Sequence, residues 1–361
     1  MKVMILANSD VGLYQFRCEI IDRLLADRNE VVLSLPKGDF IETLTKKGCR
    51  YTETPMDRKG MNPFRDARLF LRYVKMLKKE KPDLVITYTI KPNVYGGFAC
   101  RLRKIPYGVN ITGLGRTFDK DGMLHKLVRG LYRVACKKAK VIFFENEENR
   151  RVFLGERMAT EAQTCLLSGA GVNLEKFSWK EYPNTAPVHF LYMGRVMEQK
   201  GIGEVLEAME RLVGDGIPCK LSVVGSLEED FRERLERCET AGWLQYFGYQ
   251  KDVRPFIEKA HCVLLPSWYH EGMANTNLES AASGRPIITS TISGCREAVL
   301  DGVSGFLVEG RNSFELYQKM KEFTQLSFEA RKNMGLAGRA HMEKCFDKRK
   351  VVEETIQRLY A

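Results

Sequence analysis

Short apolar, β-favouring runs alternate with longer segments of helical periodicity along the whole chain. The expected strands of the first half are residues 2–7, 30–35, 83–89, 107–111 and 140–145. Those of the second half are residues 188–193, 220–224, 243–247, 262–265 and 286–290. Helical stretches such as 65–79 and 123–138 lie between strands. Strand and helix alternating at this spacing predict parallel sheets covered by helices on both faces, in the α/β class.

The chain has 361 residues, which is more than a single hydrophobic core usually supports, so two domains are expected. A polar stretch with two prolines, residues 180–187, is the best boundary. We therefore predict a first domain at 1–180 and a second domain at 186–340. The segment 341–361 is expected to be a helix that packs back toward the first domain. Two doubly wound domains would direct their strand ends into a shared central cleft, where such folds bind ligands.

Composition narrows the class of protein. The content of 44% apolar and 29% charged residues is ordinary for a soluble globular protein, and no apolar run is long enough for a membrane span. The N-terminal apolar stretch is too short for a signal peptide. Ten cysteines are scattered without a CxxC pair, which argues against zinc and against a disulfide framework. We expect reduced core cysteines in a cytoplasmic protein.

The positive charge is concentrated in the first half of the chain. Residues 1–180 carry 34 Lys and Arg against 20 Asp and Glu, a balance of +14, whereas the remainder has a balance of −3. Nucleic acid, an anionic membrane surface or an anionic substrate can each explain this excess. No nucleic-acid-binding motif is recognisable, so the membrane and the substrate remain. In the helix 123–138, packing explains the apolar stripe, and the basic face favours peripheral contact with anionic headgroups.

Two acids, Glu271 and Glu279, stand eight positions apart after the apolar run 262–265. Asn275 is a good N-cap for the helix that follows, and the loop 272–274 would direct backbone N–H groups beyond the strand end. A helix N-terminus in that position favours phosphate. Glu279, one turn into the helix, can reach a ribose diol, and Glu271 would face a sugar. A single surface acid would carry little weight, but two acids flanking a glycine loop favour a binding site.

Two cations, Arg195 and Lys200, follow the expected strand 188–193. Gly194 and Gly201 allow the backbone to turn and to approach a ligand closely. A guanidinium fork with a lysine charge can stabilise a diphosphate leaving group. Exposed cations after a strand are common, so this motif gains its value from Glu271 and Glu279 downstream.

Taken together, these segments resemble the retaining glycosyltransferases of family 4, which include sucrose synthases and bacterial polysaccharide and phosphatidylinositol mannosyltransferases. The residues that carry the resemblance are Gly194-Arg195…Lys200-Gly201, Pro266-Ser267…Glu271-Gly272…Glu279, Gly284-Arg-Pro286 and Gly305-Phe-Leu-Val308. The resemblance implies the GT-B fold, in which two Rossmann-like doubly wound domains face a central cleft and the second domain holds most of the donor.

The resemblance also implies roles by position. It assigns catalysis to Arg195, Lys200 and Glu271. The donor-binding residues that it implies are Gly12, Arg195, Lys200, Tyr249, Gly272, Met273, Ala274, Asn275 and Glu279. No metal or other cofactor is expected, because the two cations take the electrostatic role. We interpret Asp119-Lys-Asp121, which looks like a metal motif, as a solvated loop.

The first half resembles a narrower group, the sugar transferases of capsule, exopolysaccharide and lipid-linked oligosaccharide synthesis. Residues 87–93 and 110–115 carry that likeness. Many family members have a histidine where this chain has Gly113, and its role is not transferred to His125, the nearest histidine. The acceptor side is predicted at Lys91, Asn93, Thr112 and Gly113.

The predicted activity is a retaining transfer of a hexose or N-acetylhexosamine from a UDP-sugar. The predicted acceptor is a polyprenyl-diphosphate-linked saccharide at the inner face of the cytoplasmic membrane. One alternative is an isomerase similar to UDP-N-acetylglucosamine 2-epimerases, which needs an acid/base pair at C2 that the sequence does not show convincingly. Another is a non-catalytic sugar-nucleotide-binding protein, in which loss of Arg195, Lys200 or Glu279 would be expected.

Overall fold

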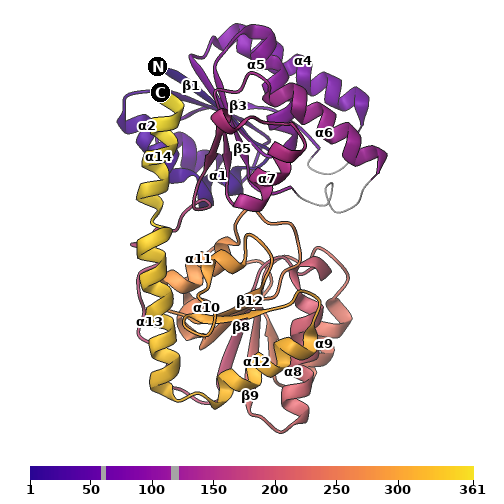
Figure 1. The fold of residues 1–361 in the computed structure, drawn as a ribbon, viewed down its shortest axis with the longest axis vertical. Coiled ribbons are helices and arrows are strands. Elements are labelled where there is room, and N and C mark those ends of the chain that lie inside the picture. The colour runs from indigo at the N-terminus through magenta and orange to yellow at the C-terminus, as the bar shows by residue number, and fades with distance from the viewer. Residues whose placement is uncertain (58–61, 115–121) are drawn as a thin grey trace. The chain divides into compact units, whose positions relative to one another are not determined.

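The computed structural model describes residues 1–57, 62–114 and 122–361, with the backbone alone for Met123 and Leu124. The chain forms two compact units (Figure 1). Unit 1 comprises Met1–Ala170 and Arg349–Ala361, and unit 2 comprises Gly171–Lys348. In each unit helices cover both faces of a parallel sheet, which confirms the predicted pair of Rossmann-like α/β folds.

The sheet of unit 1 has seven strands in the order β3-β2-β1-β4-β5-β6-β7, and every neighbouring pair is parallel. The strands are β1 (Lys2–Leu6), β2 (Glu30–Leu35), β3 (Arg50–Glu53), β4 (Leu84–Tyr88), β5 (Tyr107–Ile111), β6 (Val141–Phe144) and β7 (Thr164–Leu166). The helices are α1 (Asp10–Phe16), α2 (Cys18–Ala26), α3 (Ile41–Lys46), α4 (Pro63–Glu80), π-helix η1 (Pro92–Gly96), α5 (Gly97–Arg103), α6 (Met123–Cys136), α7 (Glu147–Gly155), 3-10 helix η3 (Glu161–Gln163) and α14 (Lys348–Tyr360).

Both faces of this sheet are buried, which explains the continuous apolar runs of its central strands. In β1, Val3 and Ile5 belong to the core cluster that also holds residues of α2 and α14. Met4 and Leu6 point the other way, into the cluster with residues of α4, α5 and α6.

The last helix, α14, completes unit 1 rather than unit 2. Its residues Ile356 and Leu359 are buried in the core of unit 1. At its surface Glu353 pairs with Arg23 of α2. The chain therefore leaves unit 1 near residue 170 and returns to it near residue 349.

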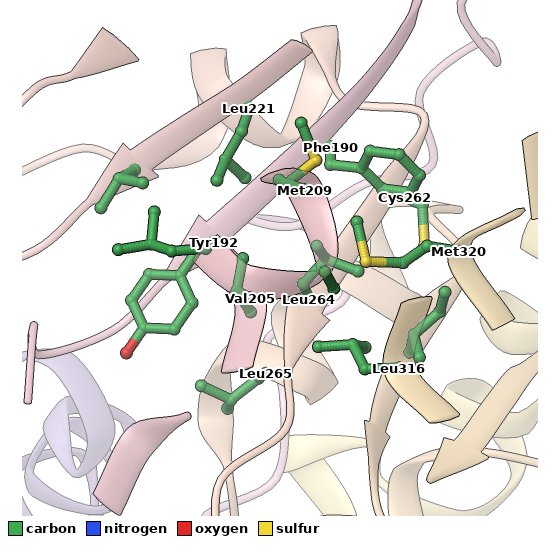
Figure 2. Packing of buried hydrophobic residues seen from close by; sticks show 14 of the residues in the cluster. Phe190, Tyr192, Val205, Met209, Leu221, Cys262, Leu264, Leu265, Leu316 and Met320 are labelled. Carbon is green, nitrogen blue, oxygen red and sulfur yellow. The ribbon is translucent and has the colours of Figure 1, made fainter. Parts of the chain in front are cut away.

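The sheet of unit 2 has six parallel strands in the order β10-β9-β8-β11-β12-β13. The strands are β8 (Val188–Met193), β9 (Cys219–Val224), β10 (Leu244–Tyr246), β11 (Cys262–Leu265), β12 (Ile287–Ser290) and β13 (Gly305–Val308). The helices are η4 (Glu198–Lys200), α8 (Ile202–Gly214), α9 (Arg232–Thr240), α10 (Arg254–Lys259), α11 (Asn275–Ala282), η5 (Arg296–Ala298), α12 (Ser313–Gln325) and α13 (Phe328–Cys345). Figure 2 shows one face of its core, where Phe190 and Leu264 of the strands meet Met209 of α8 and Met320 of α12.

The proline-containing stretch 180–187 is packed against unit 2 and does not form a free linker. The buried guanidinium of Arg285 donates to the backbone carbonyls of Lys180 at 3.0 Å and Glu181 at 2.9 Å. The hydroxyl of Tyr182 donates to the carbonyl of His261 at 2.8 Å. These bonds tie the segment to unit 2, so the division between the units falls earlier, after Ala170.

A neutral histidine lies in the core of unit 2. His261 is 1% exposed, and its Nδ1 accepts from the N–H of His189 at 3.0 Å. Its Nε2 lies 3.1 Å from the carbonyl oxygen of Thr185, so Nε2 carries the proton and donates. Burial, followed by the charge of Arg331, lowers the pKa of His261 from 6.5 to about 4.

We expect His261 to make folding pH-dependent. An unfolded histidine takes up a proton below pH 6.5, whereas the folded one stays neutral down to about pH 4. The contribution of His261 is therefore fully present above pH 6.5 and falls by up to about 3 kcal/mol as the pH drops through that window. The free energy of unfolding of the wild type and of His261→Gln can be measured in urea at pH values between 6.5 and about 4. The difference between the two proteins should become smaller as the pH falls. A difference that stays constant would contradict this assignment.

Candidate active site

In unit 2 both predicted cations and the predicted acid Glu271 meet at the carboxyl ends of two neighbouring strands. β8 lies between β9 and β11, so the chain crosses over in opposite directions on its two sides. Parallel α/β sheets bind ligands at such a switch point. The loops after β8 and β11 are joined there, because the N–H of Trp268 and the hydroxyl of Ser267 donate to the carbonyl of Gln199 at 2.9 and 3.2 Å.

The structure pairs one predicted cation with one predicted acid. Lys200 and Glu271 form an ion pair in which each side chain is 12% exposed. The hydroxyl of Ser267 lies 3.4 Å from the same Glu271 oxygen. Arg195 and Lys200 both lie over the ring of Tyr269, at 5.4 and 5.5 Å from its centroid. Tyr269 was not predicted from the sequence, although its position between Ser267 and Glu271 in the loop could have suggested it.

Glycines allow the loops to approach this closely. Gly201 has a φ of +78°, and a Cβ there would lie 2.4 Å from the carbonyl oxygen of Pro266. Gly225, after β9, has a φ of +152°, and its Cβ would lie 1.7 Å from the carbonyl oxygen of Gly194. Gly294 would place a Cβ 2.8 Å from that of Glu271. Gly225 and Gly294 were not predicted, because the contacts that require them come from distant parts of the chain.

The start of α11 differs from its prediction. Asn275 is the first helical residue, and Ala274 occupies the capping position without a side-chain cap. The predicted N-cap role of Asn275 is therefore wrong, because the helix starts one residue earlier than an N-cap at 275 requires. The N–H of Ala274 donates to the carbonyl of Gly294 at 2.7 Å. A phosphate would therefore meet the first-turn N–H groups of Asn275 and Thr276, at the positive end of the helix.

Glu279 lies one turn into α11 and is partly buried. Burial raises the pKa of its carboxyl to about 7, and Lys176 and Lys348 oppose that shift only in part. Within the described residues, no ion pair to Glu279 is formed. A carboxyl with an elevated pKa and unused acceptor oxygens is a typical candidate for ligand binding.

The predicted donor-binding residue Tyr249 lies in the loop that follows β10. Phe247 packs edge-on against Phe256, with ring centroids 4.8 Å apart, and its carbonyl accepts from Gln250 at 2.7 Å. Tyr249, in the same loop, is 51% exposed. The hydroxyl of Tyr246 donates to the carbonyl of Gly225 at 2.9 Å, which links this loop to the glycine contacts after β9.

The predicted acceptor residues of unit 1 lie at the carboxyl ends of β4 and β5. Lys91 forms an ion pair with Asp66 of α4 at 2.7 Å. Asn93 is 1% exposed, and its amide bonds to Thr87 at 2.7 Å and to the carbonyl of Asn110 at 2.8 Å. The polar groups of Lys91 and Asn93 are thus used inside the unit, and their acceptor role stays a prediction.

The other residues predicted in unit 1 are more exposed than Asn93 or lie on other elements than β4 and β5. Thr112 and Gly113 follow β5 and are partly exposed, and Gly113 has a φ of +130°. Gly12 lies on α1, and a Cβ there would meet nothing within 4 Å. His125 lies in the first turn of α6. Asp119, Asp121 and Gly115 lie outside the described residues.

Two protein-family models match the chain, one in each unit. The model described as "Glycosyl transferase 4-like" matches residues 2–146. The model described as "Glycosyl transferases group 1" matches residues 187–325, which include every candidate residue of unit 2.

Curated relatives match across most of the chain. The N,N'-diacetylbacillosaminyl-diphospho-undecaprenol alpha-1,3-N-acetylgalactosaminyltransferase of Campylobacter jejuni is 26% identical over 337 residues, which cover 89% of this chain and 88% of that protein. The UDP-Gal:alpha-D-GlcNAc-diphosphoundecaprenol alpha-1,3-galactosyltransferase of Escherichia coli is 25% identical over 267 residues, 70% of this chain and 68% of its own.

Solved structures share the fold. Alr3699/HepE of Anabaena, crystallised in complex with UDP and glucose, has a TM-score of 0.82 at 17% identity over 100% of this chain and 99% of its own. Likeness to glycosyltransferases of this architecture confirms the expected GT-B fold.

We expect Gly201 to be required for the close approach of the loops after β8 and β11. Gly201→Ala forces a Cβ against the Pro266 carbonyl in a left-handed conformation, and should lower the free energy of unfolding by about 2 kcal/mol or more. Gly203→Ala is the matched control, because a Cβ on this α8 residue meets nothing within 4 Å. It should raise stability by about 0.5–1 kcal/mol. Urea unfolding measures both, and equal stability of the two variants would contradict the steric argument.

Proposed function

The chain belongs to the group 1, or family 4, retaining glycosyltransferases, and on that premise we propose that it transfers a sugar from a UDP-linked donor to a lipid-linked saccharide. The sugar is a hexose or an N-acetylhexosamine. The observation that carries the proposal is the gathering of Arg195, Lys200 and Glu271 around one switch point of unit 2, with Glu279 one turn into the helix that follows β11. Both curated relatives are named for an undecaprenyl-diphosphate-linked acceptor, and Alr3699/HepE was crystallised with UDP.

Each residue has a distinct role in this proposal. Arg195 and Lys200 bind the diphosphate and stabilise the negative charge that develops as UDP leaves. The carboxylate of Glu279 accepts hydrogen bonds from the ribose hydroxyls. The acceptor hydroxyl attacks the anomeric carbon on the face that UDP vacates, and a diphosphate oxygen takes its proton. The two side-chain cations supply the positive charge near the leaving group, so we expect no metal requirement.

The ion pair between Lys200 and Glu271 is part of this proposal. Without a donor, Glu271 neutralises Lys200 in a mostly buried position. A bound diphosphate shares the Lys200 ammonium, and an oxygen of Glu271 then becomes available to a hydroxyl of the donor hexose. The pair thus keeps both side chains positioned before the substrate arrives, which reduces the reorganisation that binding requires.

We expect UDP to bind without added metal, and more tightly than GDP or ADP, in calorimetric titrations. Replacing a charged hydrogen-bond acceptor costs about 1.5–3 kcal/mol, so Glu279→Gln should weaken UDP binding roughly 10- to 150-fold with the fold intact. Because the pKa of Glu279 is about 7, UDP affinity of the wild type should also rise between about pH 6 and pH 8, as the carboxylate forms.

The matched control is Glu322→Gln on α12, which should bind UDP like the wild type at every pH. Absence of UDP binding by the wild type would contradict the transferase proposal. Binding that is unchanged in Glu279→Gln would contradict only the ribose assignment.

We propose further that unit 1 contacts an anionic membrane surface at the cytoplasmic face. α4, α5 and α6 lie side by side (Figure 1). They carry basic residues together with exposed apolar side chains: Phe64, Leu71, Leu102, Leu127 and Val134, which are 49–86% exposed. Among the described residues, no helix is both long and apolar enough to pass through a bilayer. Basic residues combined with exposed apolar side chains favour peripheral binding to anionic lipid.

Sedimentation with vesicles tests this surface. The wild type should bind vesicles of phosphatidylcholine with phosphatidylglycerol and should not bind pure phosphatidylcholine. Phe64→Ser, which removes an exposed ring from α4, should reduce the bound fraction. Phe314→Ser, which removes an exposed ring from α12 of unit 2, should not. Equal loss in both variants, or binding independent of lipid charge, would contradict the assignment.

A further inference from the structure

Unit 1 has a switch point of its own, between β1 and β4. Three polar side chains from separate elements meet beside it. Arg17 ends α1, Tyr88 is the last residue of β4, and Glu145 directly follows β6. They are 7%, 4% and 7% exposed. We call Arg17, Tyr88 and Glu145 the unit 1 cluster.

The unit 1 cluster contains a buried ion pair. A terminal nitrogen of Arg17 donates to Glu145, and the guanidinium lies 5.3 Å from the centroid of the Tyr88 ring. Burial acts to lower the pKa of Arg17, but Glu145 and Tyr88 outweigh it, so the pKa stays above its ordinary value. The guanidinium of Arg17 therefore stays charged, and it is paired with the carboxyl of Glu145.

The hydroxyl of Tyr88 is buried and has no hydrogen-bond partner within the described residues. Burial raises the pKa of this phenol to about 12, with Arg17 and Glu145 acting on it in opposite directions. A buried hydroxyl without a partner destabilises the fold, and phenylalanine would fill the same space without that cost. The next residue, Thr89, is β-branched and has a φ of +73°, a strained conformation that is frequent at functional sites.

The charges of the cluster determine which ligand it suits. An anionic group would be repelled by Glu145, and a cationic group by Arg17. A neutral group with several hydroxyls suits all three residues, because a carboxylate accepts from hydroxyls while a guanidinium and a phenol donate to them. We infer that Arg17, Tyr88 and Glu145 bind hydroxyl groups of the acceptor's saccharide. This inference rests on the proposed function and makes the sugar, rather than the diphosphate, the part of the acceptor that this cluster recognises.

Tyr88→Phe is the sharpest test, because it removes a hydroxyl that makes no hydrogen bond to any residue the structure describes. The variant should be at least as stable as the wild type. Its KM for short polyprenyl-diphosphate-linked saccharides should rise about three- to tenfold, the usual effect of one lost hydrogen bond, with the KM for the UDP-sugar unchanged. Tyr73→Phe is the matched control, because Tyr73 also has a buried hydroxyl without a partner in the described chain but belongs to the core on the opposite face of the sheet. It should leave every parameter unchanged.

A binding measurement makes the test independent of turnover. Saturation-transfer NMR with methyl glycosides of hexoses and N-acetylhexosamines should show contact with the wild type and weaker contact with Tyr88→Phe and Glu145→Gln. Absence of contact with the wild type, or equal contact in all three proteins, would overturn the inference. Transfer by the wild type with an unchanged acceptor KM in Tyr88→Phe would also overturn it and leave the proposed function standing. UDP binding is measured separately, so failure of the donor site is recognised by itself.

Discussion

The candidate donor site depends on close contacts between backbone segments. At these contacts only glycine fits, because there is no room for a side chain. Gly201 against Pro266, Gly225 against Gly194, and Gly294 against Glu271 bring four loops of unit 2 together at the carboxyl ends of its strands. A β-carbon at any of these glycines would separate the loops. The charged side chains acquire their positions from this packing, so the rigidity of the site originates in the backbone.

The two units contain similar combinations of charged and aromatic side chains, although these side chains come from different positions of the two sheets. Unit 2 pairs Lys200 with Glu271 next to Tyr269, and unit 1 pairs Arg17 with Glu145 next to Tyr88. In both units an acid holds a cation in a mostly buried position, beside an aromatic ring and at a strand end. The two units differ in the positive charge that remains after this pairing. Unit 2 adds the further cation Arg195 and a helix N-terminus, which suit a diphosphate, whereas the unit 1 cluster matches its one cation with one acid and suits hydroxyl groups.

Local pattern predicted the centre of each sheet well and its edges poorly. All ten expected strands are present to within two residues, because strands buried on both faces form continuous apolar runs. The unexpected strands β3, β7 and β13 are all edge strands, which are short and pair on one side only. The cations and acids of unit 2 were found because each follows a buried strand in a recognisable motif. The unit 1 cluster was not, since Arg17 and Glu145 are 128 positions apart and neither lies in a motif.

The return of α14 to unit 1 has a consequence for the order in which the protein matures. Ile356 and Leu359 are part of the unit 1 core, so the first 170 residues emerge from the ribosome with that core still open. Unit 2 is synthesised in full before the helix that closes unit 1 has been made. The half of the protein that is translated first therefore reaches its final packing last.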